Sequence, residues 1–95
     1  MLSYRYEPKN NRVAAYKDGM EVGQITFIPN GDIWDATHTF VEPVHRGGPI
    51  ASEMLKLLVE TAREEHKKII PTCSYVKKAL NAIEEYQDVL KQSAN

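Results

Sequence analysis

A strand-to-helix junction decides the fold, and it reads Val41-Glu42-Pro43-Val44-His45-Arg46-Gly47-Gly48-Pro49-Ile50-Ala51. Its two adjacent glycines let the backbone turn sharply or pass close to a ligand. Pro49 suits the first position of a helix, where a missing N–H is no loss. The chain is therefore expected to change from strand to helix within this junction.

The junction fits two roles. A helix N-terminus presents unpaired N–H groups and a partial positive charge, which together suit a phosphate group. Arg46 adds a formal charge and two parallel donors for phosphate oxygens. The alternative is a plain turn with a solvated arginine. Spacing alone favours the plain turn, because glycine-rich turns before helices are common.

Downstream of the junction, the hydrophobic period is helical. One helix is expected to begin at Ile50 and to end near His66, where basic residues suit the negative end of the helix dipole. Its apolar positions all fall on one helical face. They are Ile50, Ala51, Met54, Leu55, Leu58, Val59 and Ala62.

The end of the chain predicts one more strand and one more helix. Residues 68–72 are typical of a short strand, and Pro71 places that strand's end or a sheet edge there. A helix is expected over residues 74–83, with a further turn after Tyr86. Residues 92–95 are expected to fray.

Upstream of the junction, turn signals separate strand-like runs. Asp18-Gly19 is a strong hairpin signal, because both turn positions need a positive φ. A second turn is expected at residues 29–32. The predicted strands are residues 3–6, 12–17, 20–28 and 33–41.

Alternation along residues 33–41 predicts which side chains share a face of the sheet. One face would carry Trp34, Ala36, His38 and Phe40. The other face would carry Asp35, Thr37 and Thr39.

The resulting order is β-β-β-β-α-β-α, which is an α+β fold. A right-handed crossover would lay the strand at residues 68–72 parallel to the strand at residues 33–41, with the long helix on one face. A length of 95 residues predicts one domain over residues 1–95.

Composition excludes several classes of protein. The net charge is −1, with 12 basic and 13 acidic residues, so the concentrated positive face of a nucleic-acid binder is not expected. The longest apolar run, residues 13–16, is too short for a membrane span or a signal-peptide core. A single cysteine cannot form an internal disulfide, which predicts a reducing, cytoplasmic location. No spacing of ligands predicts a metal site.

The junction resembles the acyl-CoA pyrophosphate loop of the GNAT superfamily of N-acetyltransferases. That loop reads Gln or Arg, two residues, Gly, one residue, then Gly or Ala. Arg46 matches the first position and Ala51 the last, while Pro49 stands where the pattern has glycine. Over about residues 12–90 the chain resembles the compact GNAT-like proteins of roughly 90–100 residues, a size for one domain. The shared motifs are His38-Thr39, Pro71-Thr72-Cys73 and Glu85-Tyr86-Gln87-Asp88.

The resemblance implies that acetyl-CoA binds in a cleft where two parallel strands splay apart, here residues 33–41 and 68–72. Backbone N–H groups near Phe40 and Val41 would bind pantetheine and the thioester carbonyl. The pyrophosphate would be held by Arg46 and by the N–H groups of Gly47, Gly48, Ile50 and Ala51. Pro49 has no N–H, so one donor of the pattern is lost.

Cys73 and His38 are the candidate catalytic residues. Cys73 precedes a helix, whose N-terminus favours thiolate, so it would accept the acetyl group or protonate the departing CoA thiolate. The alternative is a buried structural thiol. His38 would act as a base, because free imidazole titrates near neutral pH; its alternative is a hydrogen-bonded core or cleft histidine. Tyr75 and Tyr86 are further proton donors, although such tyrosines more often pack with a wet hydroxyl.

Two functions follow. The first is an acetyl-CoA-dependent N-acetyltransferase acting on a small amine or an exposed peptide amine, by direct attack or through Cys73. The second is a non-catalytic module that binds CoA, another phosphorylated ligand or a protein in the same cleft. The chain is too short for the two helices that help form the amine site in full-length GNAT enzymes. The acceptor site is therefore expected to be open and shallow, or completed by an oligomer or protein partner.

Overall fold

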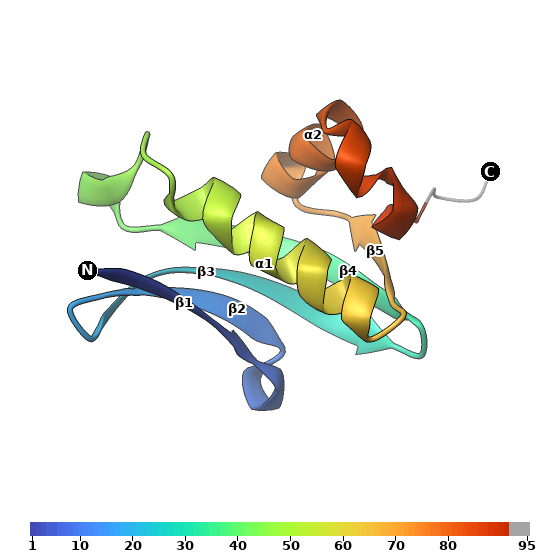
Figure 1. Ribbon diagram of the computed structural model, residues 1–95, viewed down its shortest axis with the longest axis horizontal. Helices are drawn as coiled ribbons and strands as arrows, with labels where there is room; N and C mark the ends of the chain where they lie inside the picture. The colour runs from blue at the N-terminus through green and yellow to red at the C-terminus, as the bar shows by residue number, and fades with distance from the viewer. Residues whose placement is uncertain (92–95) are drawn as a thin grey trace.

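Five strands form one sheet in chain order, β1-β2-β3-β4-β5, in the computed structural model, which describes residues 1–91 (Figure 1). The strands are β1 (Leu2–Glu7), β2 (Arg12–Lys17), β3 (Met20–Asn30), β4 (Ile33–Val41) and β5 (Lys68–Pro71). The helices are η1 (Pro8–Asn10), η2 (Pro43–His45), α1 (Ile50–Glu64), α2 (Ser74–Ala82) and η3 (Glu84–Val89). β4 and β5 are parallel, and the other neighbours are antiparallel. The predicted α+β fold and its crossover are confirmed.

Turn chemistry explains where the strands end. Asp18 and Gly19 both have positive φ, 51° and 85°, as the predicted hairpin requires. β3 runs to Asn30, beyond the predicted end at residue 28, because Pro29 still pairs with Trp34 across the ladder. The expected fraying of residues 92–95 lies outside the described residues. No helix within residues 1–91 is long and apolar enough to cross a membrane.

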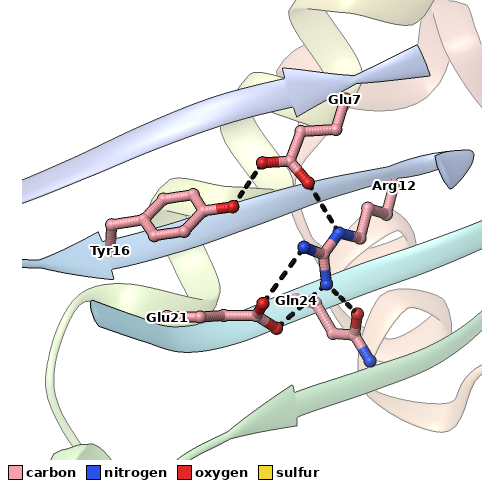
Figure 2. Close-up of polar contacts among 5 residues, drawn as sticks. All are labelled: Glu7, Arg12, Tyr16, Glu21 and Gln24. Carbon is pink, nitrogen blue, oxygen red and sulfur yellow. Dashed lines mark hydrogen bonds and ion pairs between the residues drawn. The ribbon is translucent and has the colours of Figure 1, made fainter. Parts of the chain in front are cut away.

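The helices cover one face of the sheet, which we call the helix face. α1 lies across it, and α2 and η3 lie beside α1 (Figure 1). One core cluster joins buried residues of the sheet, α1, α2 and η3. The opposite face, which we call the open face, carries polar side chains in front of the strands, while the helices lie behind (Figure 2).

A β-bulge in β4 decides which side chains lie on which face. Thr26 pairs with His38, but the next residue of β3, Phe27, pairs with Ala36, so Thr37 is an extra residue without a partner. An extra residue reverses the alternation beyond it. The prediction that His38 and Phe40 share a face with Ala36 is therefore wrong.

The bulge leaves Trp34 and Ala36 buried on the helix face, followed by Thr39 and Val41. Thr37 contacts Thr26 on the open face, their Oγ1 atoms being 3.4 Å apart. Strict alternation could not place these residues, because it assumes a ladder without insertions.

Gly23 allows the start of α1 to lie close to the end of β4. A Cβ built at Gly23 would stand 3.0 Å from the carbonyl oxygen of Phe40 and 3.2 Å from Cγ2 of Ile50. A side chain there would crowd the Phe40 carbonyl and force the side chains of Ile50 and Met54 to shift. The glycine thus keeps the junction and the β4 backbone close together.

A polar network covers part of the open face (Figure 2). The Arg12 guanidinium donates to Glu7 at 2.8 Å, to Glu21 at 2.9 Å and to Gln24 at 2.6 Å, and the Tyr16 hydroxyl donates to Glu7. These residues lie on β1, β2 and β3, so the network ties the edge strand β1 to its neighbours. Arg12 and Glu7 are partly buried, and their pairing offsets the cost of removing these charges from water.

Acid should weaken this network. The hydrogen bonds from Tyr16 and Arg12 hold the pKa of Glu7 below its ordinary value. The network therefore stabilises the fold fully above the unfolded-state pKa, about 4.3, and loses its contribution as the pH falls through the lower folded-state pKa. Glu7→Gln should lower the melting temperature at pH 7 and change it less at pH 3. Glu64→Gln, at an exposed site on α1, is the control; an equal loss at both pH values for Glu7→Gln would contradict the assignment.

Candidate active site

The parallel strands β4 and β5 form a fork. They pair from Ile33 with Lys68 to Ala36 with Pro71, and then β5 ends while β4 continues to Val41. The last backbone hydrogen bond across the fork within residues 1–91 is that of the Cys73 N–H, which donates to the Ala36 carbonyl at 2.8 Å. Within residues 1–91, no strand pairs with β4 on that side beyond Ala36. This is the splayed arrangement of two parallel strands that the family resemblance implied.

Cys73 lies in the fork at the start of α2. Its Sγ is 3.3 Å from Oγ1 of Thr39, on the helix face of β4. Burial by itself raises the pKa of the thiol, but hydrogen bonds from the Thr39 hydroxyl and from the backbone N–H groups of Val76, Tyr75 and Thr39 outweigh it. The net pKa is below the ordinary value, which favours a reactive thiolate.

Backbone groups of β4 face the fork at alternate residues. The Glu42 N–H donates to Val22 of β3, so Val41 presents its groups to the opposite side. There the Val41 carbonyl accepts the Arg46 Nε at 2.8 Å. By the same alternation, the backbone groups of Phe40 point toward β3. The half-exposed Phe40 ring lies under the Arg46 guanidinium, with 5.6 Å between the ring centroid and Arg46 Cζ.

The junction ends in a set of unused donors. Within residues 1–91, no hydrogen bond is donated by the backbone N–H groups of Gly47, Gly48, Ile50, Ala51 and Ser52. Pro49, the residue before α1, uses its carbonyl to accept from Glu53 at 2.9 Å. Unpaired N–H groups at a helix N-terminus are suited to an anion.

The two glycines of the junction differ in their conformation. Gly47 has a φ of +88°, which favours glycine strongly. Gly48 has no positive φ, and a Cβ built there meets only the His45 carbonyl oxygen, at 3.7 Å. The fold therefore requires glycine at 47 but leaves room for alanine at 48.

The remaining candidates lie around the fork on different sides. His38 is exposed on the open face, opposite the side that carries Cys73. Tyr75 and Tyr86 pack against the core on the helix side, and burial raises the pKa of both phenols. Within residues 1–91, no group of three His, Cys, Asp or Glu side chains is placed to hold a metal ion.

Sequence reasoning missed Thr39 as a partner of Cys73. The His38-Thr39 pair was visible as a motif, but alternation placed Thr39 on the wrong face. It also missed Asp35 and Thr72, which hydrogen-bond across the open side of the fork through the Thr72 hydroxyl. The sequence signal that could have identified Asp35 and Thr72 was their position near the end of the predicted pairing between the two parallel strands.

Comparisons with known proteins place the chain among acetyltransferases. The family model described as GCN5-related N-acetyl-transferase matches residues 11–89. The solution structure of a GCN5-like protein from Staphylococcus aureus, provisionally assigned as an N-acetyltransferase, has a TM-score of 0.73 and 27% identity. That alignment covers 98% of this chain and 91% of the other.

Larger acetyltransferases share the fold at lower identity. A ribosomal-protein-alanine N-acetyltransferase from Brucella melitensis has a TM-score of 0.56 and 20% identity, over 88% of this chain and 63% of its own. A provisional acyl-CoA N-acyltransferase from Klebsiella pneumoniae has a TM-score of 0.60 and 18% identity, over 82% and 59%. The chain thus spans about three fifths of these two proteins. None of the curated proteins compared with the chain matches it.

Alanine at the two junction glycines should affect stability differently. Gly47→Ala should lower the free energy of unfolding by about 1–2 kcal/mol, because a side chain at this positive φ is strained. Gly48→Ala should leave it nearly unchanged. Urea denaturation of both variants measures the difference; equal losses would contradict the distinction.

Proposed function

We propose, from the premise that the chain belongs to the GCN5-related N-acetyltransferase family, that it binds acetyl-CoA in the fork and transfers the acetyl group to an amine. The observation that carries the proposal is the set of unused N–H donors at the start of α1, next to a fork that holds a cysteine thiol of lowered pKa. The acceptor class is a small amine or an exposed peptide amine.

The residues of the junction fit a pyrophosphate. Four residues would donate their backbone N–H groups: Gly47, Gly48, Ile50 and Ala51. Pro49 has no N–H, but its lack of a donor does not remove these four. Arg46 would use its outer nitrogens, since its Nε is already bonded to Val41. A glycine at 48 that the fold does not require is explained by close approach of a ligand to the backbone.

The fork would orient the rest of the cofactor. Val41 presents backbone groups to it, and Phe40 offers a half-exposed ring beside Arg46. The thioester would then lie near Cys73 and Thr39. Amide donors at that place would stabilise the negative charge that develops on the carbonyl oxygen.

Acetyl transfer requires one C–N bond to form and one C–S bond to break. In direct transfer, the neutral amine attacks the carbonyl carbon, the CoA thiolate leaves, and Cys73 protonates it. In the relay, the Cys73 thiolate attacks the carbonyl carbon first, the CoA thiolate leaves, and S-acetyl-Cys73 forms. The amine then attacks this thioester, which forms the C–N bond and releases the Cys73 thiolate. His38 would take the amine proton from an acceptor that approaches the fork on the open face.

A second candidate function is a non-catalytic module that binds CoA, another phosphorylated ligand or a protein. The observation that favours it is that, within residues 1–91, α1, α2 and η3 all pack into the core cluster of the helix face, so none of these three helices encloses a small acceptor on the open face. Catalysis would still be possible at such an open face if the acceptor amine belonged to a macromolecule, or if a partner protein completed the site. Experiments on Cys73 distinguish the two functions, because only the acetyltransferase uses its thiol in a reaction.

Binding of CoA should be visible at the junction. In a titration with CoA, the amide NMR signals of residues 47–52 should shift most, because they would contact the pyrophosphate. Gly48→Ala should weaken binding about tenfold or more, through the added methyl group. Gly31→Ala, in the turn at the other end of β4, is the control and should keep the affinity. Shifts confined to other regions would contradict the proposal.

Cys73 should be modified by acetyl-CoA if the relay operates. Incubation without an acceptor should add one acetyl group, seen by intact mass, and Cys73→Ala should abolish it. If Cys73 acts only as an acid, no adduct forms, but Cys73→Ala still slows transfer. Unchanged transfer by Cys73→Ala would contradict both roles and leave Cys73 as a packing residue.

A further inference from the structure

Thr39 reaches the helix face only because of the bulge in β4. It pairs with Ile25, whose side chain is fully buried under α1, while its neighbours His38 and Phe40 face the open side. In a regular ladder Thr39 would face the open side. The extra residue Thr37 therefore brings the Thr39 hydroxyl to the side of the fork that carries Cys73.

The backbone of Cys73 is fixed on both sides. Its N–H donates to Ala36 at 2.8 Å, and its carbonyl accepts from Lys77 at 2.9 Å. With the backbone held, the position of the sulfur depends mainly on one side-chain rotation. The 3.3 Å contact with Thr39 Oγ1 selects one rotamer, and a β-branched threonine is itself stiff about χ1.

We propose that Thr39 is a positioning residue for Cys73: its hydroxyl holds the sulfur at one place in the fork, as acceptor from the thiol and as donor to the thiolate. The proposal rests on the function proposed above. A hydroxyl can exchange these two roles by rotating its hydrogen, so the contact survives when Cys73 ionises. The sulfur would then need no movement before it attacks a thioester or protonates a leaving thiolate.

Electrostatics favour the same role. Among residues 1–91, Thr39 supplies the one side-chain hydrogen bond on the sulfur; the others come from the backbone N–H groups of Val76, Tyr75 and Thr39 itself. No charged side chain contributes to the lowering of the Cys73 pKa within that range. Loss of the Thr39 hydroxyl should therefore raise the pKa of the Cys73 thiol directly, because no charged side chain within residues 1–91 contributes to lowering it.

The test is the thiol pKa, obtained from the rate of iodoacetamide alkylation of the full chain between pH 5 and pH 10. Thr39→Val keeps the side-chain shape and removes the hydroxyl; it should raise the pKa by roughly one unit, the scale of one hydrogen bond to a charged group. Thr39→Ser keeps the hydroxyl and should restore the wild-type profile.

Thr37→Val is the matched control. It removes a hydroxyl from the same strand, but one that contacts Thr26 on the open face, so the profile of Cys73 should not move. An unchanged pKa in Thr39→Val, or equal shifts in Thr39→Val and Thr37→Val, would overturn the proposal. If Thr39→Val fails to fold, Thr39→Ala gives the same comparison against Thr39→Ser.

A second readout separates this proposal from the proposed function. The affinity for CoA, measured by calorimetry, should be nearly the same in wild type and Thr39→Val, while the rate of acetylation of Cys73 by acetyl-CoA should fall about tenfold. Acetylation at the wild-type rate in Thr39→Val would overturn the positioning role. Failure of the wild type to bind CoA at all would instead overturn the proposed function, whatever the thiol pKa shows.

Discussion

The extra residue in β4 is the constraint from which the arrangement of the fork follows. Thr37 has no partner on β3, so every side chain after it changes face relative to a regular strand. Trp34 and Ala36 remain in the core below the bulge, and Thr39 enters the helix side above it. A bulge bends and twists its strand as well as shifting its register, which suits a point where two parallel strands separate.

Two distinct sides of the fork result. The helix side holds Cys73, Thr39 and the start of α1, which Gly23 allows to approach β4 closely. The open side holds His38 together with the hydrogen-bonded pair Asp35 and Thr72. In the proposed function, cofactor and acceptor would therefore reach the same carbonyl carbon from opposite faces of one sheet. The Arg12 network lies on the open face, in front of the strands, while the helices lie behind (Figure 2).

The sequence predicted the element order well, because its signals were local and strong. Asp18-Gly19 required a hairpin, and the apolar positions from Ile50 onward fitted one helical face. The parallel placement of β5 followed from the handedness of crossovers. These features depend on residues close together in the chain, so pattern alone could identify them.

The faces of the candidate site could not be predicted in the same way. The bulge arises from the pairing of β3 with β4. No pattern in residues 33–41 predicts that Thr37 will lack a partner in that pairing. His38 was expected beside Ala36 for this reason, and Thr39 was not expected beside Cys73. The Arg12 network was equally invisible, because it joins residues from three strands whose register only the folded sheet defines.

The most direct measurement is the position of the acetyl group itself, from intermolecular nuclear Overhauser effects between bound acetyl-CoA and the ¹³C-labelled protein. The account predicts contacts from the acetyl methyl protons to the Thr39 methyl group and the Cys73 β-protons, with the pantetheine beside Val41. Contacts from the acetyl methyl to open-face residues such as Gln24 or Ile28, with none to Cys73, would contradict it.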